Sequence, residues 1–417
     1  MHVIEQLLVL GVVMLLGFFS LAFFERTRIP DVLLLLLIGV LLGPVFRIVD
    51  PAYFVSLAPL VGTLALIIVL FDAGLGLNLF RVFGELSRTT AFTVAVFILS
   101  CGFAAALLHF AFGWRLLYAL LMGAIIGGSS SNIVVPIISR LGASEDTKTI
   151  LSLESVLTDA LCIVAAVALV KVATLGSFDA SVALHDVASA FSIAAVAGFA
   201  FGMFWIGILR RFYGKPFGYV VTLAILFIMY SFVEVLKGSG AVAVLVFSIV
   251  LGNSQEIARM FKLEGDYSLD KSIKVVETEI SFFVRTFFFV FLGLVFNLGA
   301  LAVQPLLLAG ALTLALIVAR FVGVRLLVMF SPSLRSSAVL LTTMMPRGLA
   351  AAVLAFLPAE SGVQIPLLVE TVFLVILFTN VVATIGAFAS EKGGRASPAP
   401  PSPKGRPRIV PSRGKGG

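Results

Sequence analysis

Two acidic residues, Glu154 and Asp159, lie inside the apolar stretch 149–173, in the string ESVLTDALCIV. A carboxylate at the centre of a bilayer costs about 3 kcal/mol on insertion scales, so such residues usually have a function. On a helix, Ser155 and Asp159 share one face, whereas Glu154 points about 140° away from Asp159. The pattern predicts that Glu154 pairs with a buried arginine and that Asp159, beside a hydroxyl, binds a cation or a proton. The alternative for both acids is an ion pair that only holds helices together.

The composition places these acids in a membrane protein. The chain has 417 residues, of which 60% are hydrophobic and 12% are charged, far from the usual soluble composition. It contains no Walker loop, no HExxH string and no nucleophile elbow, and its three histidines are scattered. We therefore predict a polytopic membrane domain that is not an enzyme and needs no cofactor.

The fold class predicted from the apolar segments is an all-α polytopic membrane protein with about thirteen transmembrane helices. The predicted spans are 5–24, 30–49, 57–78, 89–112, 115–139, 149–173, 183–209, 217–236, 240–252, 278–298, 302–330, 336–358 and 363–388.

The basic residues predict how these helices are oriented. Lys and Arg are concentrated in every second loop, and such loops are cytoplasmic by the positive-inside rule. The rule places the N-terminus outside and the C-terminus in the cytoplasm of a cell (plasma) membrane protein, and it explains the net charge of +7 without nucleic-acid binding. The tail 391–417, rich in Pro, Gly, Ser and basic residues, is predicted to be disordered, and it could contact anionic lipid. The basic pairs and clusters are Arg26 and Arg28; Arg81 and Arg88; Arg140 and Lys148; Arg210, Arg211 and Lys215; and Arg259, Lys262, Lys271 and Lys274.

Two of the predicted spans contain helix-breaking strings at mid-membrane, GAIIGGSSSNIVVP (123–136) and TTMMPRGLAAA (342–352). Broken helices are tolerated in a membrane where their free backbone groups line a cavity. The two strings fall in the fifth and twelfth spans, which is the spacing that two inverted six-helix repeats with one linking helix produce. We therefore expect broken helices 5 and 12 to cross, although a Gly-rich stretch can also serve only close helix packing.

With these motifs, the chain resembles the monovalent cation/proton antiporters of the NhaP and sodium/proton exchanger type over nearly all of residues 1–390. The sixth-helix motif of that family matches ESVLTD, with Thr158 where Asn is usual. Where exchangers have Thr-Asp-Pro in the fifth helix, this chain has Ser129, Ser130 and Ser131, closer to the potassium-efflux branch. The resemblance leaves the choice between Na⁺, Li⁺ and K⁺ open.

The resemblance also assigns residues outside these two motifs. Arg320 in IVARFVGV resembles the arginine that pairs with the sixth-helix glutamate, so a structural ion pair with Glu154 is implied. Arg347 in PRGLAAA resembles the arginine-glycine motif of the twelfth helix, and Asp72 in FDAGLGLN stands where related antiporters often have Glu; both would be accessory or gating residues. Arg285, in the tenth-helix motif FFVRTFFFVFLGLVF, is expected to be an end-of-helix anchor.

The implied mechanism is an elevator. Core helices 89–173 and 302–388 would carry the ion against a dimerising scaffold of 5–78 and 217–298, with 183–209 as linking helix, in a homodimer. A proton and a monovalent cation would compete for Asp159, and the exchange would be electroneutral with a 1:1 ratio. The oxygens available to the cation, besides Asp159, are those of Ser155, Thr158, Ser129 and Ser130.

Two other functions remain open from the sequence. The triple serine favours a K⁺/H⁺ antiporter of the same superfamily, or a channel or K⁺ efflux system in which the cation flows down its gradient, although the soluble nucleotide-binding domain usual in that branch is not seen in the sequence. A sodium-coupled symporter for an organic acid shares the crossed broken helices, but it has no strict need for a titrating aspartate in the sixth span.

Overall fold

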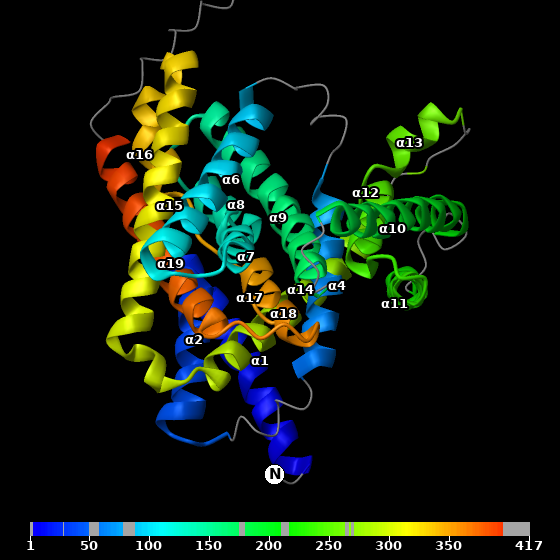
Figure 1. Cartoon of the computed structure of the whole chain (residues 1–417), viewed down its shortest axis with the longest axis horizontal. Coiled ribbons are helices and arrows are strands. Elements are labelled where there is room, and N and C mark those ends of the chain that lie inside the picture. Colours follow the sequence, from blue (N-terminus) through cyan, green and yellow to red (C-terminus); the bar gives the residue numbers. More distant parts are fainter. Residues whose placement is uncertain are drawn as a thin grey trace, which may run out of the picture.

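The computed structural model describes residues 3–27, 29–49, 58–77, 88–174, 180–209, 217–262, 267 and 271–394. All regular elements in these ranges are helices, as Figure 1 shows. Most of the predicted tail, from residue 395 onward, lies outside the described residues. The helices are α1 (Val3–Thr27), α2 (Asp31–Val40), η1 (Leu41–Val45), α4 (Ala58–Gly76), α6 (Arg88–Ala106), η2 (Leu107–Ala111), α7 (Leu116–Ile126), α8 (Ser131–Ser139), α9 (Glu145–Thr174), α10 (Ala180–Leu209), α11 (Gly218–Val235), α12 (Gly240–Gly252), α13 (Ser254–Met260), α14 (Lys271–Val295), η4 (Leu298–Leu301), α15 (Val303–Phe330), η5 (Pro332–Ser337), α16 (Ala338–Thr343), α17 (Leu349–Leu354), α18 (Leu357–Glu360) and α19 (Leu368–Gly394).

The helices have the length and composition of membrane spans. Among the described residues, nine are long and apolar enough to cross a bilayer, or ten if α12 and α13, bent by 77°, form one span. Three shorter apolar helices cover Asp31–Val45, Leu60–Gly76 and Leu349–Glu360. The all-α polytopic fold is thus confirmed, while the count of thirteen spans and the inverted repeats stay predictions.

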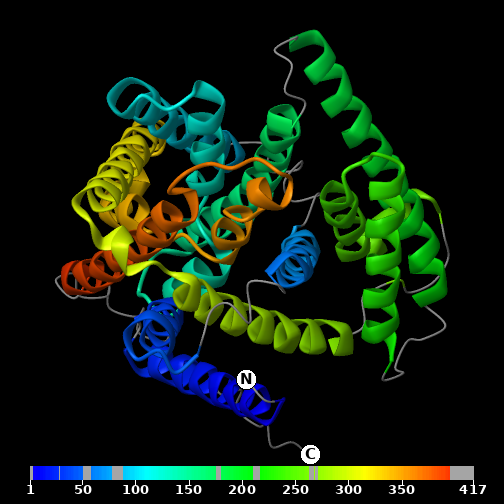
Figure 2. The same ribbon diagram turned by 60° about the horizontal axis from the view of Figure 1, so that its bottom comes forward.

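The helices form two groups that meet at α4 and α14. One group contains α6, α7, α9, α15, α17 and α19, and the other contains α10, α11 and α12, drawn in green at the right of Figure 2. Helix α4 lies between the groups and contacts α12 on one side and α9 and α17 on the other, while α14 runs past both α4 and α17. The expected division into a moving core and a scaffold stays a prediction, but α4 is the helix along which such groups would slide.

Helix α14 is held against α2 by a close approach of backbones and by a buried ion pair. A side-chain carbon at Gly293 would lie 2.5 Å from the carbonyl oxygen of Leu36, so this crossing requires glycine. Eight residues before that point, Arg285 pairs with Asp31 at 3.1 Å, and the two side chains are only 15% and 8% exposed. Arg285 therefore lies within α14 and pairs with α2, which is a more interior position than that of the end-of-helix anchor we expected.

Two helical segments are interrupted where the sequence predicts breaks. Helix α7 ends at Ile126 and α8 begins at Ser131, while α16 ends at Thr343 and α17 begins at Leu349. The two interruptions touch, because the backbone N–H of Ser130 donates to the carbonyl oxygen of Pro346 at 2.8 Å. Proline has no N–H of its own and disfavours helix at the residue before it, which explains the break near Pro346.

Glycine explains why the first break can lie against α9. A side-chain carbon at Gly128 would lie 2.8 Å from the carbonyl oxygen of Thr158 and 2.6 Å from the sulfur of Cys162. Only glycine leaves room for this approach. The break is thereby pressed against the turn of α9 that lies between Glu154 and Cys162.

Candidate ion-binding site

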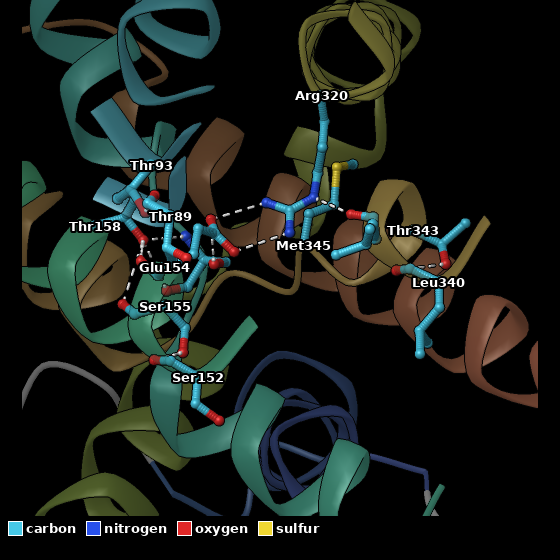
Figure 3. A network of polar contacts seen from close by, with 12 residues as sticks. Thr89, Thr93, Ser152, Glu154, Ser155, Thr158, Arg320, Leu340, Thr343 and Met345 are labelled. Carbon is cyan, nitrogen blue, oxygen red and sulfur yellow. Dashed lines mark hydrogen bonds and ion pairs between the residues drawn. The ribbon is translucent and has the colours of Figure 1, made fainter. Parts of the chain in front are cut away.

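Glu154 and Arg320 form a buried, bidentate ion pair between α9 and α15 (Figure 3). The two terminal guanidinium nitrogens of Arg320 donate to Oε2 and Oε1 of Glu154 at 2.9 Å each. The third donor, Nε, bonds the carbonyl oxygen of Leu341 on α16 at 2.6 Å, and the hydroxyl of Ser129 donates to Oε1 of Glu154 at 2.9 Å. Glu154 is 1% exposed and Arg320 is 2% exposed. The negative charge of Glu154 is therefore fully compensated, and no room is left on it for a transported ion.

Asp159 stands one and a half turns further along α9 in a different environment. Its Oδ2 accepts two hydrogen bonds from Ser131, one from the backbone N–H at 3.1 Å and one from the hydroxyl at 2.8 Å. Ser131 is the first residue of α8, so the positive end of a half-helix faces the carboxylate. No donor in the described part of the chain bonds Oδ1, and the side chain is only half-buried. One carboxylate oxygen is thus held in place while the other is free for a ligand.

The residue after Ser131 extends this network to a second acid. The side-chain amide of Asn132 donates to Oδ2 of Asp72 on α4 at 3.3 Å. Asp159, Ser131, Asn132 and Asp72 therefore form a continuous polar line from α9 through the start of α8 to α4. The structure brings the predicted accessory residue Asp72 next to the site, through two residues that the sequence did not single out as ligands.

Of the other predicted cation ligands, Ser129 and Thr158 join the first break to α9, while Ser155 bonds within α9. The Thr158 hydroxyl accepts from the backbone N–H of Ser129 at 3.1 Å and donates to the carbonyl oxygen of Glu154 at 2.9 Å. The Ser155 hydroxyl donates to the carbonyl oxygen of Ser152 at 3.0 Å, as Figure 3 shows. Within the described residues, none of these bonds ends on Asp159, and Ser130 lies at the crossing. The binding of a cation by Ser129, Ser130, Ser155 and Thr158 stays a prediction.

Arg347 holds the crossing of the two breaks. Its guanidinium donates to the carbonyl oxygens of Met345 at 2.9 Å and of Gly127 at 3.5 Å, and the residue is 2% exposed. Asn380 and Thr379 of α19 bond its backbone carbonyl and N–H at 2.8 and 3.2 Å. The carbonyls of Met345 and Gly127, which accept from the guanidinium, come just after the ends of α16 and α7, where helices carry partial negative charge. The arginine therefore compensates the two negative helix ends, while the positive end of α8 faces Asp159.

The predicted site residues thus separate into two layers. One layer joins Glu154, Arg320 and the residues of the breaks, and in it the carboxylate of Glu154 is compensated by Arg320 and bonded by Ser129. The other layer contains Asp159 and Asp72, which face each other across Ser131 and Asn132. Ser131 was missed as a ligand because the sequence shows three consecutive serines and does not say which of them begins the half-helix.

Similar proteins are antiporters of small cations. Na(+)/H(+) antiporter 1 of Methanocaldococcus jannaschii is 25% identical over 304 residues, which cover 70% of this chain and 68% of that protein. The low-affinity Na(+)/H(+) antiporter NhaS1 of Synechocystis is 28% identical over 302 residues, or 71% of this chain and 55% of the relative. The K(+)/H(+) antiporter NhaP of Alkalimonas amylolytica is 24% identical over 257 residues, or 60% and 44%.

The fold agrees with these relatives. A solved structure of the sodium proton antiporter MjNhaP1 from Methanocaldococcus jannaschii at pH 8 superposes with a TM-score of 0.76 at 22% identity, covering 92% of this chain and 100% of that one. The family model described as sodium/hydrogen exchanger, transmembrane, matches residues 11–389, almost the whole described chain. Proteins of this kind are transporters and not enzymes. The chain belongs to the sodium/hydrogen exchanger family of transmembrane proteins.

Proposed function

We propose that this protein exchanges a monovalent cation, Na⁺ or Li⁺, for protons across a membrane and that Asp159 carries both in turn. The observation that supports this most directly is the contrast between the two acids of α9. Glu154 is neutralised by Arg320, whereas Asp159 is half-buried and is held through one oxygen by Ser131, while no described residue donates to its other oxygen. The relatives named as Na⁺/H⁺ antiporters support Na⁺ and H⁺ as the two transported ions.

The physical basis of coupling is the cost of moving a bare carboxylate through apolar surroundings. An empty, ionised Asp159 carries a net negative charge into a low-dielectric passage, which costs several kcal/mol. A bound proton or a bound monovalent cation removes that charge, so the two loaded states cross and the empty one does not. Proton and cation then alternate on one carboxylate, which couples their movements in opposite directions.

Proton movement in proteoliposomes tests this proposal. The vesicles would contain a pH-sensitive dye, and Na⁺, Li⁺ and K⁺ would be added separately to the native chain and to Asp159→Asn. We expect a signal with Na⁺ or Li⁺ that Asp159→Asn abolishes. Asp146→Asn, the same substitution at an exposed position on the same helix, should leave the signal unchanged. No signal with any cation from folded native protein, or a signal that survives Asp159→Asn, would refute the proposal.

The same geometry supports an electroneutral 1:1 exchange. If only Asp159 changes its load while Glu154 stays paired with Arg320, each cycle carries one cation one way and one proton the other way. The exchange rate at a fixed pH gradient should then be insensitive to a membrane potential imposed with K⁺ and valinomycin, with Na⁺ as substrate. A strong acceleration or collapse of the rate would mean that a second group, such as Asp72, changes its charge during the cycle.

A second candidate function is K⁺/H⁺ antiport. Two observations favour it: the serines 129–131 in place of the exchanger Thr-Asp-Pro, and the relative from Alkalimonas amylolytica that is named a K(+)/H(+) antiporter. A signal with K⁺ alone in the same assay would select it. Under either function, we propose that the protein is a homodimer in the plasma membrane, with its N-terminus outside and its C-terminus in the cytoplasm.

A further inference from the structure

A second acidic residue lies beside Asp72, on the side away from Asp159. The carboxyl groups of Asp72 on α4 and Glu277 on α14 lie within hydrogen-bonding reach of each other. Glu277 is only 6% exposed, and its Oε1 accepts a hydrogen bond from the hydroxyl of Ser281 at 2.6 Å. Two carboxylates so close in a buried place cannot both remain ionised without a positive charge, so a proton or a cation has to lie between them.

A buried tyrosine lies near the same two carboxyl groups, since its ring packs against that of Phe71, the residue before Asp72, with centroids 6.2 Å apart. Tyr219 on α11 is 2% exposed, and its hydroxyl has no hydrogen-bond partner among the described residues. The hydroxyl is near enough to Glu277 and Asp72 for their charges to act on it. An unsatisfied buried hydroxyl costs about 1–3 kcal/mol. A ligand held by the carboxyl groups would give this hydroxyl the partner that it lacks among the described residues.

The charged residues around this cluster do not balance its two carboxyl groups. Arg285, two turns after Glu277 on α14, attracts the charge of Asp72 from a distance. Its guanidinium, however, is paired with Asp31 of α2 at 3.1 Å. From α8, only the neutral amide of Asn132 contacts Asp72. The described groups that face the pair from the neighbouring helices thus supply no dedicated positive partner. Carboxylate and hydroxyl oxygens are the ligands that a hard alkali cation prefers.

We propose that Asp72, Glu277 and Tyr219 form a second binding site, which captures the transported monovalent cation before it passes by Asn132 to Asp159. In the exchange at this site, the O–H bond of the shared carboxyl proton breaks, the proton leaves to water, and the cation takes its place between the oxygens. The net charge of the cluster is unchanged by that step. This inference depends on the proposed function, because it assigns an entry site to the same cation.

The test of the second site is transport with Glu277→Gln. The amide keeps the size of the side chain but leaves only one carboxylate, so the KM for the cation should rise about tenfold while kcat stays within twofold of the native value. Glu279→Gln, two residues along the same helix and exposed, is the matched control and should leave both constants unchanged. A native KM would overturn the proposal, whether or not kcat falls.

Tyr219→Phe keeps the test decisive if Glu277→Gln fails to fold. This variant removes only the unpartnered hydroxyl, so the thermal stability should not fall, while the KM should rise several-fold. A native KM with Tyr219→Phe would remove the hydroxyl from the site and overturn the proposal in its stated form.

A binding measurement separates the failure of this inference from the failure of the proposed function. By titration calorimetry in two buffers of different ionisation enthalpy, Asp159→Asn should still bind Na⁺. Up to one proton should be released for each Na⁺ bound. Adding Glu277→Gln to that variant should abolish the binding. If native protein transports Na⁺ but Asp159→Asn binds none, the second site is rejected while the proposed function stands. If native protein neither transports nor binds a cation, both are rejected.

Discussion

At the scale of residues, the two acids of α9 differ in what neutralises them. Glu154 has a bidentate arginine and a serine hydroxyl, whereas Asp159 has two donors from one serine and, in the described part of the chain, no basic side chain paired with it. A buried charge whose partner is removed becomes uncompensated, which typically costs about 3–5 kcal/mol. The identity of each partner therefore decides whether an acid holds the fold or carries an ion.

This contrast predicts what loss of the Glu154 carboxylate does. Glu154→Gln leaves the buried guanidinium of Arg320 uncompensated, so we expect a loss of about 3–5 kcal/mol of folding free energy. The loss should appear as a lower melting temperature and a lower yield of monodisperse protein in detergent. Glu145→Gln removes an exposed acid whose pair with Lys148 is at the surface, and its melting temperature should stay within about one degree because such pairs contribute little.

A double variant distinguishes the ion pair from other causes of instability. Arg320→Met together with Glu154→Gln removes both charges, so the pair of changes should destabilise less than the sum of the single changes. Additive losses would mean that the two side chains contribute separately, through packing, and not as a compensated pair.

A second prediction at this scale concerns Ser131. Ser131→Ala removes the hydroxyl that donates to Asp159 at 2.8 Å but keeps the backbone N–H that donates at 3.1 Å. Losing one hydrogen bond to a charged group costs about 1.5–3 kcal/mol, so the KM for the cation should change by at least about tenfold if the bond helps to place the carboxylate. Ser139→Ala, at the other end of α8, is the control, because its exposed hydroxyl donates to the carbonyl oxygen of Pro136 within the same helix. Equal kinetics for the two variants would contradict a role for Ser131.

At the scale of elements, the crossing of the two breaks is the feature that positions both layers of the site. A side-chain carbon at Gly348 would collide with the side chain of Ser130 on the opposing break. Gly348→Ala should therefore push the breaks apart, and we expect lower thermal stability and a severalfold loss of transport. Gly310→Ala on α15 is the control, because a side-chain carbon there meets nothing within 4 Å.

A second-site change shows whether this collision is the cause. Ser130→Gly removes the opposing side chain, so Ser130→Gly combined with Gly348→Ala should regain part of the lost stability and transport. If the double variant is as impaired as Gly348→Ala alone, the effect comes from the backbone conformation at residue 348 and not from contact between the breaks.

The positions of the breaks could be predicted because glycine and proline act locally. Gly127, Gly128 and Pro346 interrupt their helices through their own backbone preferences, and both interruptions lie within the strings that the sequence indicates. The pairing of Glu154 with Arg320 was also predictable, since a buried acid needs a buried base and the family resemblance supplied the candidate. These inferences need only chain-local chemistry or a known pattern.

The ligands of Asp159 could not be predicted in the same way. Choosing Ser131 over Ser129 and Ser130 requires the exact residue at which α8 begins, and helix boundaries depend on tertiary contacts as well as on local sequence. Glu277 was missed for a related reason, because it stands one residue before the predicted span 278–298 and reads as a solvated helix end. Its burial depends on α4 and α11, which are distant in sequence.

At the scale of the whole molecule, the polar line from Glu277 to Asp159 runs from α14 and α4, where the two groups of helices meet, to α8 and α9. Asp72 lies on α4, between the groups, while Asn132, Ser131 and Asp159 lie on α8 and α9. The bond from Asn132 to Asp72 is 3.3 Å long, at the weak end for a hydrogen bond. A site with one half on α4 and α14 and the other half on α8 and α9 can be opened and closed by sliding these helices past one another, without unfolding either half.

Cross-linking tests whether transport needs that sliding. A side-chain carbon at Gly76 on α4 would lie 4.0 Å from Cγ1 of Val156 on α9, so Gly76→Cys with Val156→Cys, in a background with Cys101 and Cys162 replaced by Ala, should form a bridge between α4 and α9. We expect oxidation to stop cation/proton exchange and a reductant to restore it.

The control bridge joins Gly323→Cys and Val96→Cys, whose side-chain carbons would be 3.7 Å apart, close to the disulfide value of about 3.8 Å. Both of its residues belong to one group, α15 and α6, so it should form without loss of transport. Full exchange through the oxidised Gly76–Val156 bridge would mean that α4 and α9 move together and that access alternates by a smaller, local motion.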